Sequence, residues 1–410
     1  MLDESNRPRV LIVGAGLGGL TLAQSLRKKG IPFEIFERDT DVASRSQGWA
    51  IGMHSIFDGL STFSSDMPSL RECAHHLKPL NLNSQICLYY RGMRVGVQDT
   101  PDTPCLRANR LELRKWLATN VNIHWGKKLH SVEDREDKSV LHFEDGTSAS
   151  GDVIVGADGV QSNVREHLLG RPNADILNVV PSAIIIGETT LSGPAMERQL
   201  SLGHSCYVAG PADARFSLFV GLSKINEDLS GDYYWFLVWQ DDAVEAPDYW
   251  LKSASKTAKH THALKLAQSL DPKFHEIIQL TPEEGIRDGQ MQYRDAEIAD
   301  LPAPQRLILL GDAAHPMTPF RGEGGMHAIR DAMNLADALG QVDMTKEGSL
   351  QANLQNYQQE MSRRGLDAVR NSRNAISNNV RTSNKIIAWG YEAKQLPTED
   401  ILLEDCRQPV

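Results

Sequence analysis

The sequence lacks the features that mark membrane, secreted and nucleic-acid-binding proteins. Its longest apolar runs, at 183–186 and 307–310, are strand-sized and far from the roughly 18 residues of a membrane span. The five cysteines are scattered without C-x-x-C spacing, which fits a reducing compartment and argues against a thiolate metal cluster. A strand pattern that begins by Arg9 leaves no room for a signal peptide. The net charge of -10 argues against a nucleic-acid surface. We therefore expect a soluble, cytoplasmic protein with no metal site and no integral membrane segment.

The chain is long enough for two domains, and its pattern changes twice. Strand-like and helix-like segments alternate from Arg9 to about Gly170, and mostly strands follow from Val179 to Gln240. A buried parallel-type strand then returns near 306–310, followed by a helix that closes at Gly340. This predicts an α/β fold in which a Rossmann-like nucleotide-binding domain is interrupted by a mostly β domain. The expected segments are 1–180 (nucleotide-binding, first part), 181–285 (β domain), 286–345 (nucleotide-binding, return) and 346–410 (C-terminal helical segment).

The first motif, "VLIVGAGLGGLTLAQSL", joins a buried strand to a helix through three glycines. Gly14 permits the tight turn, Gly16 allows close approach to a pyrophosphate, and Gly19 lets the helix pack on the strand. Glu37 lies 23 residues after Gly14, near the spacing of about 20 at which an acid binds ribose hydroxyls. A carboxylate at this place repels a 2′-phosphate, so the site suits FAD or NAD better than NADP.

The second motif, "DVIVGADGVQSNVREHL", places Asp158 and Gly159 in the turn after a strand. Taken alone it has two interpretations. Asp-Gly is a common turn and Ser162 a plausible helix cap, whereas a ligand at the strand end would use the same residues.

The third motif, "LILLGDAAHPMTPFRGEGGMHAIRDA", surrounds Asp312 with prolines and glycines before a helix. Gly322, Gly324 and Gly325 allow close backbone approach, and a helix N-terminus carries unpaired amides and a partial positive charge. Those amides would favour an anionic reduced flavin at its pyrimidine edge, and Asp312 is able to accept hydrogen bonds from ribityl hydroxyls.

In this order the three motifs resemble those of the FAD-dependent monooxygenases of the para-hydroxybenzoate hydroxylase type. The "RGEGG" form is similar to fungal members that modify aromatic or alkaloid-like natural products, which suggests secondary metabolism. The resemblance covers roughly residues 9–340. It implies a FAD-binding domain interrupted by a β-sheet substrate domain, with NADPH or NADH as a transient reductant.

The resemblance also implies which residues contact FAD. "RANRLELRKWL" is similar to the family's R-x-x-L-x-x-x-L helix, which makes Arg110 the expected FAD-contacting arginine and Arg107 a weaker candidate. "SRSQGWAIGM" resembles the loop that runs beside the flavin. The full predicted cofactor set is Gly14, Gly16, Leu17, Gly18, Gly19, Glu37, Arg38, Arg45, Gly48, Ala50, Arg107, Arg110, Asp158, Gly159, Asp312, Pro319, Gly322, Gly324, Gly325 and Met326.

Two positions in the third motif need comment. The family usually has Asn where this chain has Met326, so a polar side chain beside the flavin is missing, although backbone amides remain. His315 recurs within the motif, and we favour structural support over a role as a proton relay.

The implied reaction is the transfer of one oxygen atom from O2 through a C4a-(hydro)peroxyflavin to an aromatic, heteroaromatic or other electron-rich small molecule, by hydroxylation or epoxidation. The substrate is expected between the flavin and the sheet of residues 180–240. Candidate lining residues are Arg198, Tyr207, Phe219, Tyr234 and Trp239, and the weak catalytic candidates are Arg198, Tyr207, Tyr234 and His315.

Two alternatives differ in kind from this hypothesis. One is a flavin-dependent reductase or halogenase on the same scaffold, although the halogenases' W-x-W-x-I-P signature is absent. The other is a non-catalytic, protein-binding module of the same fold, against which the intact loop around Asp312 argues.

Overall fold

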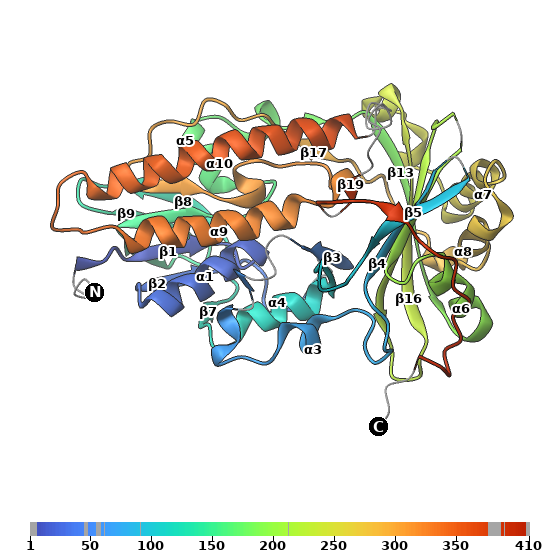
Figure 1. Ribbon diagram of the computed structural model, residues 1–410. Coiled ribbons are helices and arrows are strands. Elements are labelled where there is room, and N and C mark those ends of the chain that lie inside the picture. The colour runs from blue at the N-terminus through green and yellow to red at the C-terminus, as the bar shows by residue number, and fades with distance from the viewer. Residues whose placement is uncertain are drawn as a thin grey trace.

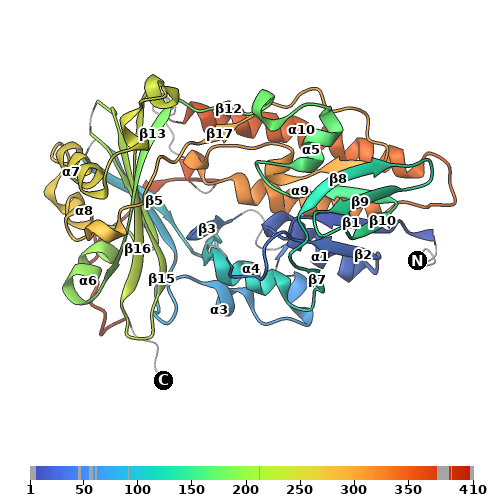
Figure 2. The same ribbon diagram turned by 180° about the vertical axis from the view of Figure 1, so that it is seen from behind.

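The computed structural model of the chain comprises two lobes that lie side by side (Figures 1 and 2). One lobe is built on a parallel sheet and holds both chain segments that flank the β domain. The other is a larger, mostly antiparallel sheet with helices on one face. The structure describes residues 6–44, 48–54, 59–60, 62–90, 92–211, 213–375, 387–388 and 390–406.

The first lobe contains a five-stranded parallel sheet in the order β18-β11-β1-β2-β7. Its strands are β1 (Val10–Val13), β2 (Phe33–Phe36), β7 (Ile123–His124), β11 (Val153–Gly156) and β18 (Leu307–Leu309). β1, β11 and β18 are wholly buried and apolar, as strands covered on both faces require. Because β18 joins this sheet, the chain does return to the first domain after the β domain.

Helices cover the parallel sheet, and α1 (Leu17–Lys29) and α9 (Gly324–Gly340) start at its carboxyl end. α1 follows β1 and ends at Gly30, whose φ of 64° suits glycine. α9 packs against α1 and against α10 (Ser349–Asn374). α4 (Arg110–Ala118), α3 (Leu70–Ala74) and α5 (Asn163–Leu169) complete this lobe. A three-stranded sheet, β8 (Leu129–Asp134), β9 (Ser139–Phe143) and β10 (Ser148–Gly151), lies at its edge.

The second lobe is a seven-stranded sheet in the order β13-β16-β15-β14-β4-β5-β21. Its strands are β13 (Ser182–Leu191), β16 (Gly231–Gln240), β15 (Ser217–Ile225), β14 (Cys206–Ala209), β4 (Gln85–Tyr90), β5 (Met93–Gln98) and β21 (Lys394–Gln395). On the side away from the first lobe it is covered by α6 (Gly193–Leu202), α7 (Lys256–Ala267) and α8 (Glu276–Gln279) (Figure 1). The other face points toward the first lobe.

Two expectations about segment boundaries were wrong. β4 and β5 lie within residues 1–180 but belong to the second sheet, because β4 pairs in parallel with β14. This long-range pairing leaves no local mark in the sequence. The C-terminal segment 346–410 is not helical throughout. α10 ends at Asn374, and the described residues nearer the C-terminus include the short strands β19 (Ile387–Ala388), β20 (Tyr391–Glu392) and β21, which pairs with the edge strand β5.

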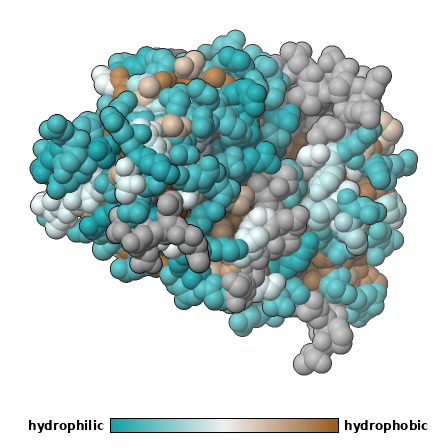
Figure 3. Space-filling model, turned by 60° about the vertical axis from the view of Figure 1, so that its left-hand side comes forward, coloured by the Kyte–Doolittle hydropathy of each residue, from teal (hydrophilic) through white to brown (hydrophobic). Residues whose placement is uncertain are grey.

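Short elements connect the lobes. β3 (Ala50–Met53) pairs with β6 (Leu106–Asn109), and both lie between the two main sheets (Figure 2). β12 (Asn178–Val179) pairs with β17 (Arg294–Asp295), where the chain enters and leaves the β domain. No helix in the described part of the chain is long and apolar enough to cross a membrane. On the face shown in Figure 3 hydrophilic side chains predominate, and hydrophobic ones form scattered patches.

Candidate functional site

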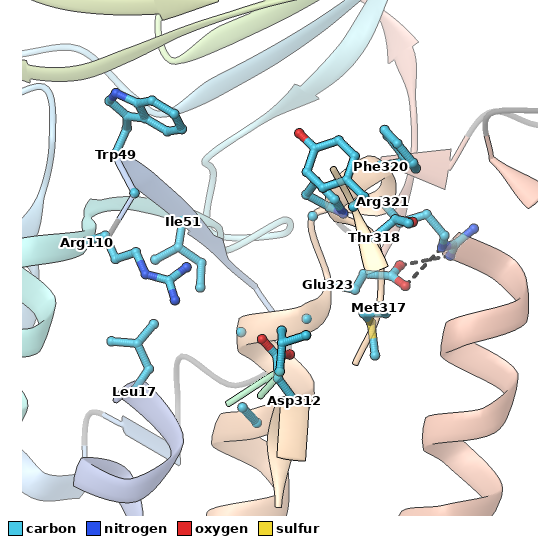
Figure 4. A pocket seen from close by; sticks show the side chains of 18 of the residues that line it. Leu17, Trp49, Ile51, Arg110, Asp312, Met317, Thr318, Phe320, Arg321 and Glu323 are labelled. Carbon is cyan, nitrogen blue, oxygen red and sulfur yellow. Dashed lines mark hydrogen bonds and ion pairs between the residues drawn. The ribbon is translucent and has the colours of Figure 1, made fainter. Parts of the chain in front are cut away.

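A cavity of about 1470 Å³ lies between the two lobes. It is bounded by the carboxyl ends of the parallel strands on one side and by the exposed face of the seven-stranded sheet on the other. Figure 4 shows side chains of the first lobe and of the segments between the lobes that point into this space, among them Arg110, Ile51 and Asp312. Its position at the strand ends of a parallel sheet is typical of ligand sites in α/β folds.

The three glycines of the first motif have different structural roles. A Cβ on Gly14 would lie 2.4 Å from the Ala157 carbonyl oxygen, and its φ of 107° disfavours other residues. A Cβ on Gly19 would lie 2.0 Å from the Gly14 carbonyl oxygen, so Gly19 allows α1 to pack on the strand end. A Cβ on Gly16 would meet nothing within 4 Å, because Gly16 faces the cavity. Among the described residues no side chain caps the N-terminus of α1, so its first amides are open to a ligand.

Glu37 reaches back to the glycine turn. Its carboxylate accepts hydrogen bonds from the backbone N–H of Ala15 at 2.7 Å and of Asp39 at 3.0 Å. It is buried, lines the cavity, and lies 3.6 Å from the Arg114 guanidinium. The carboxylate therefore fixes the turn while one side of it faces the cavity.

Arg114 is a residue that sequence reasoning missed. Its buried guanidinium donates to the carbonyl oxygens of Ala15 and Val42, both at 2.9 Å, and to the Asp39 carboxylate at 3.3 Å. It lies four residues after Arg110 on α4, so the two side chains project from the same helix face. The four-residue spacing between Arg110 and Arg114 was the sequence signal from which Arg114 could have been identified.

The Asp158 carboxylate mainly supports its own helix. It accepts hydrogen bonds from the Ser162 hydroxyl at 2.5 Å and from the N–H groups of Asn163 and Val164 at 2.8 and 3.3 Å. Burial raises the pKa of Asp158, and these hydrogen bonds oppose that shift. Ser162 in turn accepts from Arg165 N–H, as a helix cap does. The motif thus has the structural role that the turn interpretation describes, and Asp158 and Gly159 also line the cavity.

Arg165, also missed, connects the second motif to the third. Its guanidinium is buried and donates to the carbonyl oxygens of Asp312 and Ala313 at 3.2 and 3.0 Å. Burial raises the pKa of Asp312, while the charges of His315, Arg110 and Arg165 act in the opposite direction. Asp312 therefore lies on the cavity wall among cationic side chains.

The N-terminus of α9 faces the same cavity as Asp312. Gly324 and Gly325 are the first residues of the helix, both line the cavity, and no side chain caps this end in the described structure. A Cβ on Gly325 would lie 2.2 Å from Ile51 Cδ1, so a larger residue there would push the Ile51 side chain aside. Beside this helix end Glu323 accepts two hydrogen bonds from Arg321, at 2.8 and 2.9 Å (Figure 4). The amides at this helix end are thus open toward the cavity.

His315 lies behind the third motif, away from the cavity. Its Nε2 is 2.6 Å from the Asp331 carboxylate, which also accepts hydrogen bonds from Gly311 N–H and Arg364. Burial alone would lower the pKa of His315, but the Asp331 charge and hydrogen bond raise it. A Cβ on Gly365 would lie 2.6 Å from the His315 ring, so α10 packs directly on it. These contacts favour the structural role.

The seven-stranded sheet presents an aromatic wall to the cavity, which we define as Phe219, Tyr234 and Phe236. On β16, Tyr234 and Phe236 alternate with Tyr233 and Trp235, which pack into the core beneath α6 to α8. The two faces of β16 thus differ, as the sequence predicted. Phe219 and Phe236 are stacked, with centroids 5.6 Å apart. The wall offers an apolar, aromatic surface.

Trp49, another residue that was missed, joins the aromatic wall to the first lobe. Its ring stacks on Tyr234 with centroids 4.6 Å apart and an interplanar angle of 9°. The Arg287 Cζ lies 4.6 Å from the centroid of the Trp49 ring, and the indole N–H donates to Glu188. Glu188 also accepts hydrogen bonds from Arg287 at 3.1 Å. Trp49 lies between Gly48 and Ala50 in the predicted flavin loop. Those two neighbours were predicted as cofactor contacts, but the contacts of Trp49 itself were not predicted.

The structure brings most of the predicted residues together and separates a few. The cofactor candidates that line the cavity are Gly14, Gly16, Leu17, Gly18, Glu37, Arg38, Gly48, Ala50, Arg107, Arg110, Asp158, Gly159, Asp312, Pro319, Gly322, Gly324 and Gly325. Gly19 and Met326 do not line it, because Gly19 packs on Gly14 and Met326 belongs to the core of the first lobe. Arg45 lies outside the described residues.

Among the substrate-side candidates, Phe219 and Tyr234 line the cavity with the aromatic wall. Trp239 also borders the cavity, but its ring packs on His262 of α7, on the helix-covered face of the sheet. The two other candidates do not line the cavity. Arg198 is on α6, where its exposed guanidinium forms an ion pair with Glu276 at 2.5 Å. Tyr207 is buried in the opposite face of the sheet, with its hydroxyl donating to Gln199 at 2.8 Å. The expectation that Arg198 and Tyr207 contact substrate was therefore wrong. Arg198 lies on a helix within a segment that was expected to be mostly strands, and the strand pattern did not show which face the Tyr207 side chain takes.

Comparison with known proteins identifies the family. A family model described as a FAD binding domain matches residues 7–372. The FAD-dependent monooxygenase thnD of Trichoderma harzianum is 43% identical over 403 residues, which cover 96% of this chain and 99% of that protein.

Solved structures have the same fold. Klebsiella pneumoniae HpxO, determined with FAD and uric acid, matches with a TM-score of 0.69 and 20% identity, over 92% of this chain and 89% of that one. The 2,6-dihydroxypyridine-3-hydroxylase of Arthrobacter nicotinovorans matches with a TM-score of 0.71 and 18% identity, over 91% and 92% of the two chains.

Proposed function

The chain belongs to the FAD binding domain family and is an FAD-dependent monooxygenase, and we propose that it inserts one oxygen atom of O2 into an aromatic or other electron-rich small molecule. In the overall reaction, substrate, O2, NAD(P)H and a proton give oxygenated substrate, water and NAD(P)+. Its relatives include fungal monooxygenases, so we place the substrate among natural products. A cytoplasmic location stays a prediction from the sequence.

The residues of the cavity fit FAD. The space next to Gly16 is open, and a side chain at this position would project into it. Because the uncapped amides of α1 border this space, it suits a pyrophosphate. Glu37 lies at the far end of the turn, where ribose hydroxyls would be placed, and Asp312 offers a carboxylate for ribityl hydroxyls. The uncapped N-terminus of α9 suits the electron-rich pyrimidine edge of the ring. Backbone groups supply this last contact, so Met326 in place of Asn does not prevent it.

FAD, when bound, supplies the redox chemistry by passing electrons from NAD(P)H to O2 and one oxygen atom to the substrate. The protein contributes position and environment. Arg114 and Glu37 hold the glycine turn, and Arg165 holds the Asp312 loop against the second motif. The aromatic wall excludes water and orients a planar substrate. Tyr234 is the catalytic candidate that remains on the cavity wall, while His315 acts through packing.

One observation carries the proposal: a single cavity joins the glycine turn, Asp312 and the aromatic wall. The test is an anaerobic titration with NADPH or NADH, followed by flavin absorbance, with and without candidate aromatic compounds. We expect the protein to contain FAD and the flavin to bleach faster when the correct substrate class is present. Protein that takes up no FAD on reconstitution would contradict the proposal and favour a non-catalytic module. Halogenated instead of oxygenated product would favour the halogenase alternative.

A further inference from the structure

A cationic side chain lies on the cavity face of the second sheet without an acidic partner. The side chain of Arg107, which belongs to β6, extends over β15 at Gly221. A Cβ on Gly221 would lie 2.9 Å from Arg107 Nη2. The residue is 3% exposed and lines the cavity. Nη1 donates to the Ser205 carbonyl oxygen at 2.5 Å, and Nη2 donates to the Tyr234 hydroxyl. Among residues that the structure describes, none forms an ion pair with Arg107.

The groups around this guanidinium are neutral. Burial raises the pKa of Tyr234 to about 12, and it also raises the pKa of Cys206. Burial lowers the pKa of His76 well below its ordinary value, and the positive charge of Arg107 lowers it further. By contrast, the cation Arg321 on the same cavity is paired with Glu323. A buried charge without a counter-charge is costly, so a site of this kind favours a ligand that supplies one.

We propose that Arg107 binds an ionised oxygen of the substrate, and that the enzyme therefore selects planar substrates carrying a phenolate, an enolate or a carboxylate. This inference rests on the proposed function and names the substrate class of that site. It also moves Arg107 from the predicted cofactor contacts to the substrate contacts. Arg107 is then a specificity-determining residue.

The surroundings of Arg107 match such a ligand. Its Cζ lies 5.6 Å from the ring centroids of both Phe219 and Tyr234, so the cation is flanked by aromatic faces. Two of its five N–H donors are used by Ser205 and Tyr234, which leaves donors for an anionic oxygen. Val208 and Phe236 continue the apolar surface on the neighbouring strands, where an aromatic ring would lie. The site therefore combines one charged contact with an apolar platform, a combination that recognises an anionic planar molecule.

The test uses the FAD-loaded protein without NAD(P)H, so that binding is measured apart from turnover. Equilibrium dialysis gives dissociation constants for three bicyclic probes: 7-hydroxycoumarin, which ionises; 7-methoxycoumarin, which does not; and coumarin-3-carboxylate. We expect at least one of the anionic probes to bind about 10- to 100-fold more tightly than 7-methoxycoumarin, the range for a hydrogen bond to a charged group. A preference for 7-hydroxycoumarin identifies a phenolate or enolate, and one for coumarin-3-carboxylate identifies a carboxylate. Equal binding of all three would overturn the proposal.

Variants then assign the preference to Arg107. Arg107→Met should abolish it and Arg107→Lys should retain part of it, with binding of 7-methoxycoumarin little changed in either. Tyr234→Phe is the matched control, because it removes the hydroxyl that accepts from Arg107 but keeps the charge and the ring. A preference that survives in Arg107→Met, or a variant that loses FAD affinity instead, would contradict the assignment. If Arg107→Met does not fold, the probe series on the wild-type protein still tests the preference for anions, and Arg107→Lys still tests whether Arg107 causes it. Absence of FAD would refute the proposed function, whereas FAD binding without a preference for anions would refute only this inference.

Discussion

The glycines of the first motif provide a matched pair of variants that separates cofactor binding from folding. Gly16 has an extended backbone with φ of -78°, which alanine adopts freely, and its Cβ would enter open cavity. We therefore expect Gly16→Ala to leave the free energy of unfolding of the apoprotein unchanged or raised by up to about 1 kcal/mol. The methyl group would occupy space beside the α1 amides. Loss of one charge-assisted hydrogen bond there, about 1.5–3 kcal/mol, corresponds to an affinity for FAD that is weaker by about 10- to 150-fold.

Gly19→Ala should show the opposite pattern. Its Cβ would lie 2.0 Å from the Gly14 carbonyl oxygen, and a backbone atom does not move as cheaply as a side chain. We expect a loss of about 1–3 kcal/mol or more in apoprotein stability. Thermal unfolding of the two apoproteins measures stability, and FAD titration followed by flavin fluorescence measures affinity. The account would be refuted if Gly16→Ala bound FAD as tightly as wild type, or if Gly19→Ala were as stable.

Three further predictions concern other contacts. Burial raises the pKa of Asp331, but His315 and Arg364 hold it at about 2, so its contribution to stability is present above pH 4 and falls as pH drops toward 2. Asp331→Asn should cost about 3–5 kcal/mol at neutral pH and remove this part of the acid dependence, as measured by urea unfolding across pH; an unchanged profile would contradict it. Arg114→Met should lower both apoprotein stability, by about 3 kcal/mol, and FAD affinity, whereas the exposed Arg198→Met should change neither. Trp49→Leu should raise the KM for an aromatic substrate about 2- to 10-fold through lost stacking on Tyr234, while Trp49→Phe keeps most of it. Equal KM values in the two Trp49 variants would argue against stacking as the cause.

The parts of the fold with local signals were predictable from the sequence. Val10–Val13 and Leu307–Leu309 are short apolar strands beside glycine turns, and the helix expected to close at Gly340 ends there. The glycines, Glu37 and Asp312 all reach one cavity because the carboxyl ends of parallel strands share one edge of a sheet. The residue types of the motifs, together with the rule that parallel strands end at one edge of the sheet, were enough to predict that these residues of the first lobe lie around one cavity.

The substrate side was less predictable, because it depends on long-range pairing. β4 and β5 join the second sheet through the pairing of Cys206 with Ile86, which no local pattern shows. Tyr207 and Tyr234 are both aromatic residues on strands, yet they face opposite sides of the sheet. Arg107 was predicted as a cofactor contact because it lies three residues before Arg110 in the sequence. In the structure its side chain lies on the face of the second sheet, where Gly221 has no side chain to obstruct it. Register and burial decide these roles, and both depend on tertiary structure.

The most direct test of the central claim is the origin of the oxygen in the product. The purified protein, loaded with FAD and supplied with NADPH and an aromatic compound that accelerates flavin reduction, would be incubated under ¹⁸O2 in unlabelled water. Mass spectrometry of the product then measures the label. The account predicts one ¹⁸O atom per product molecule, with NADPH consumed in proportion. Product that carries oxygen from water, or NADPH oxidation that yields only peroxide with every substrate class tried, would contradict it.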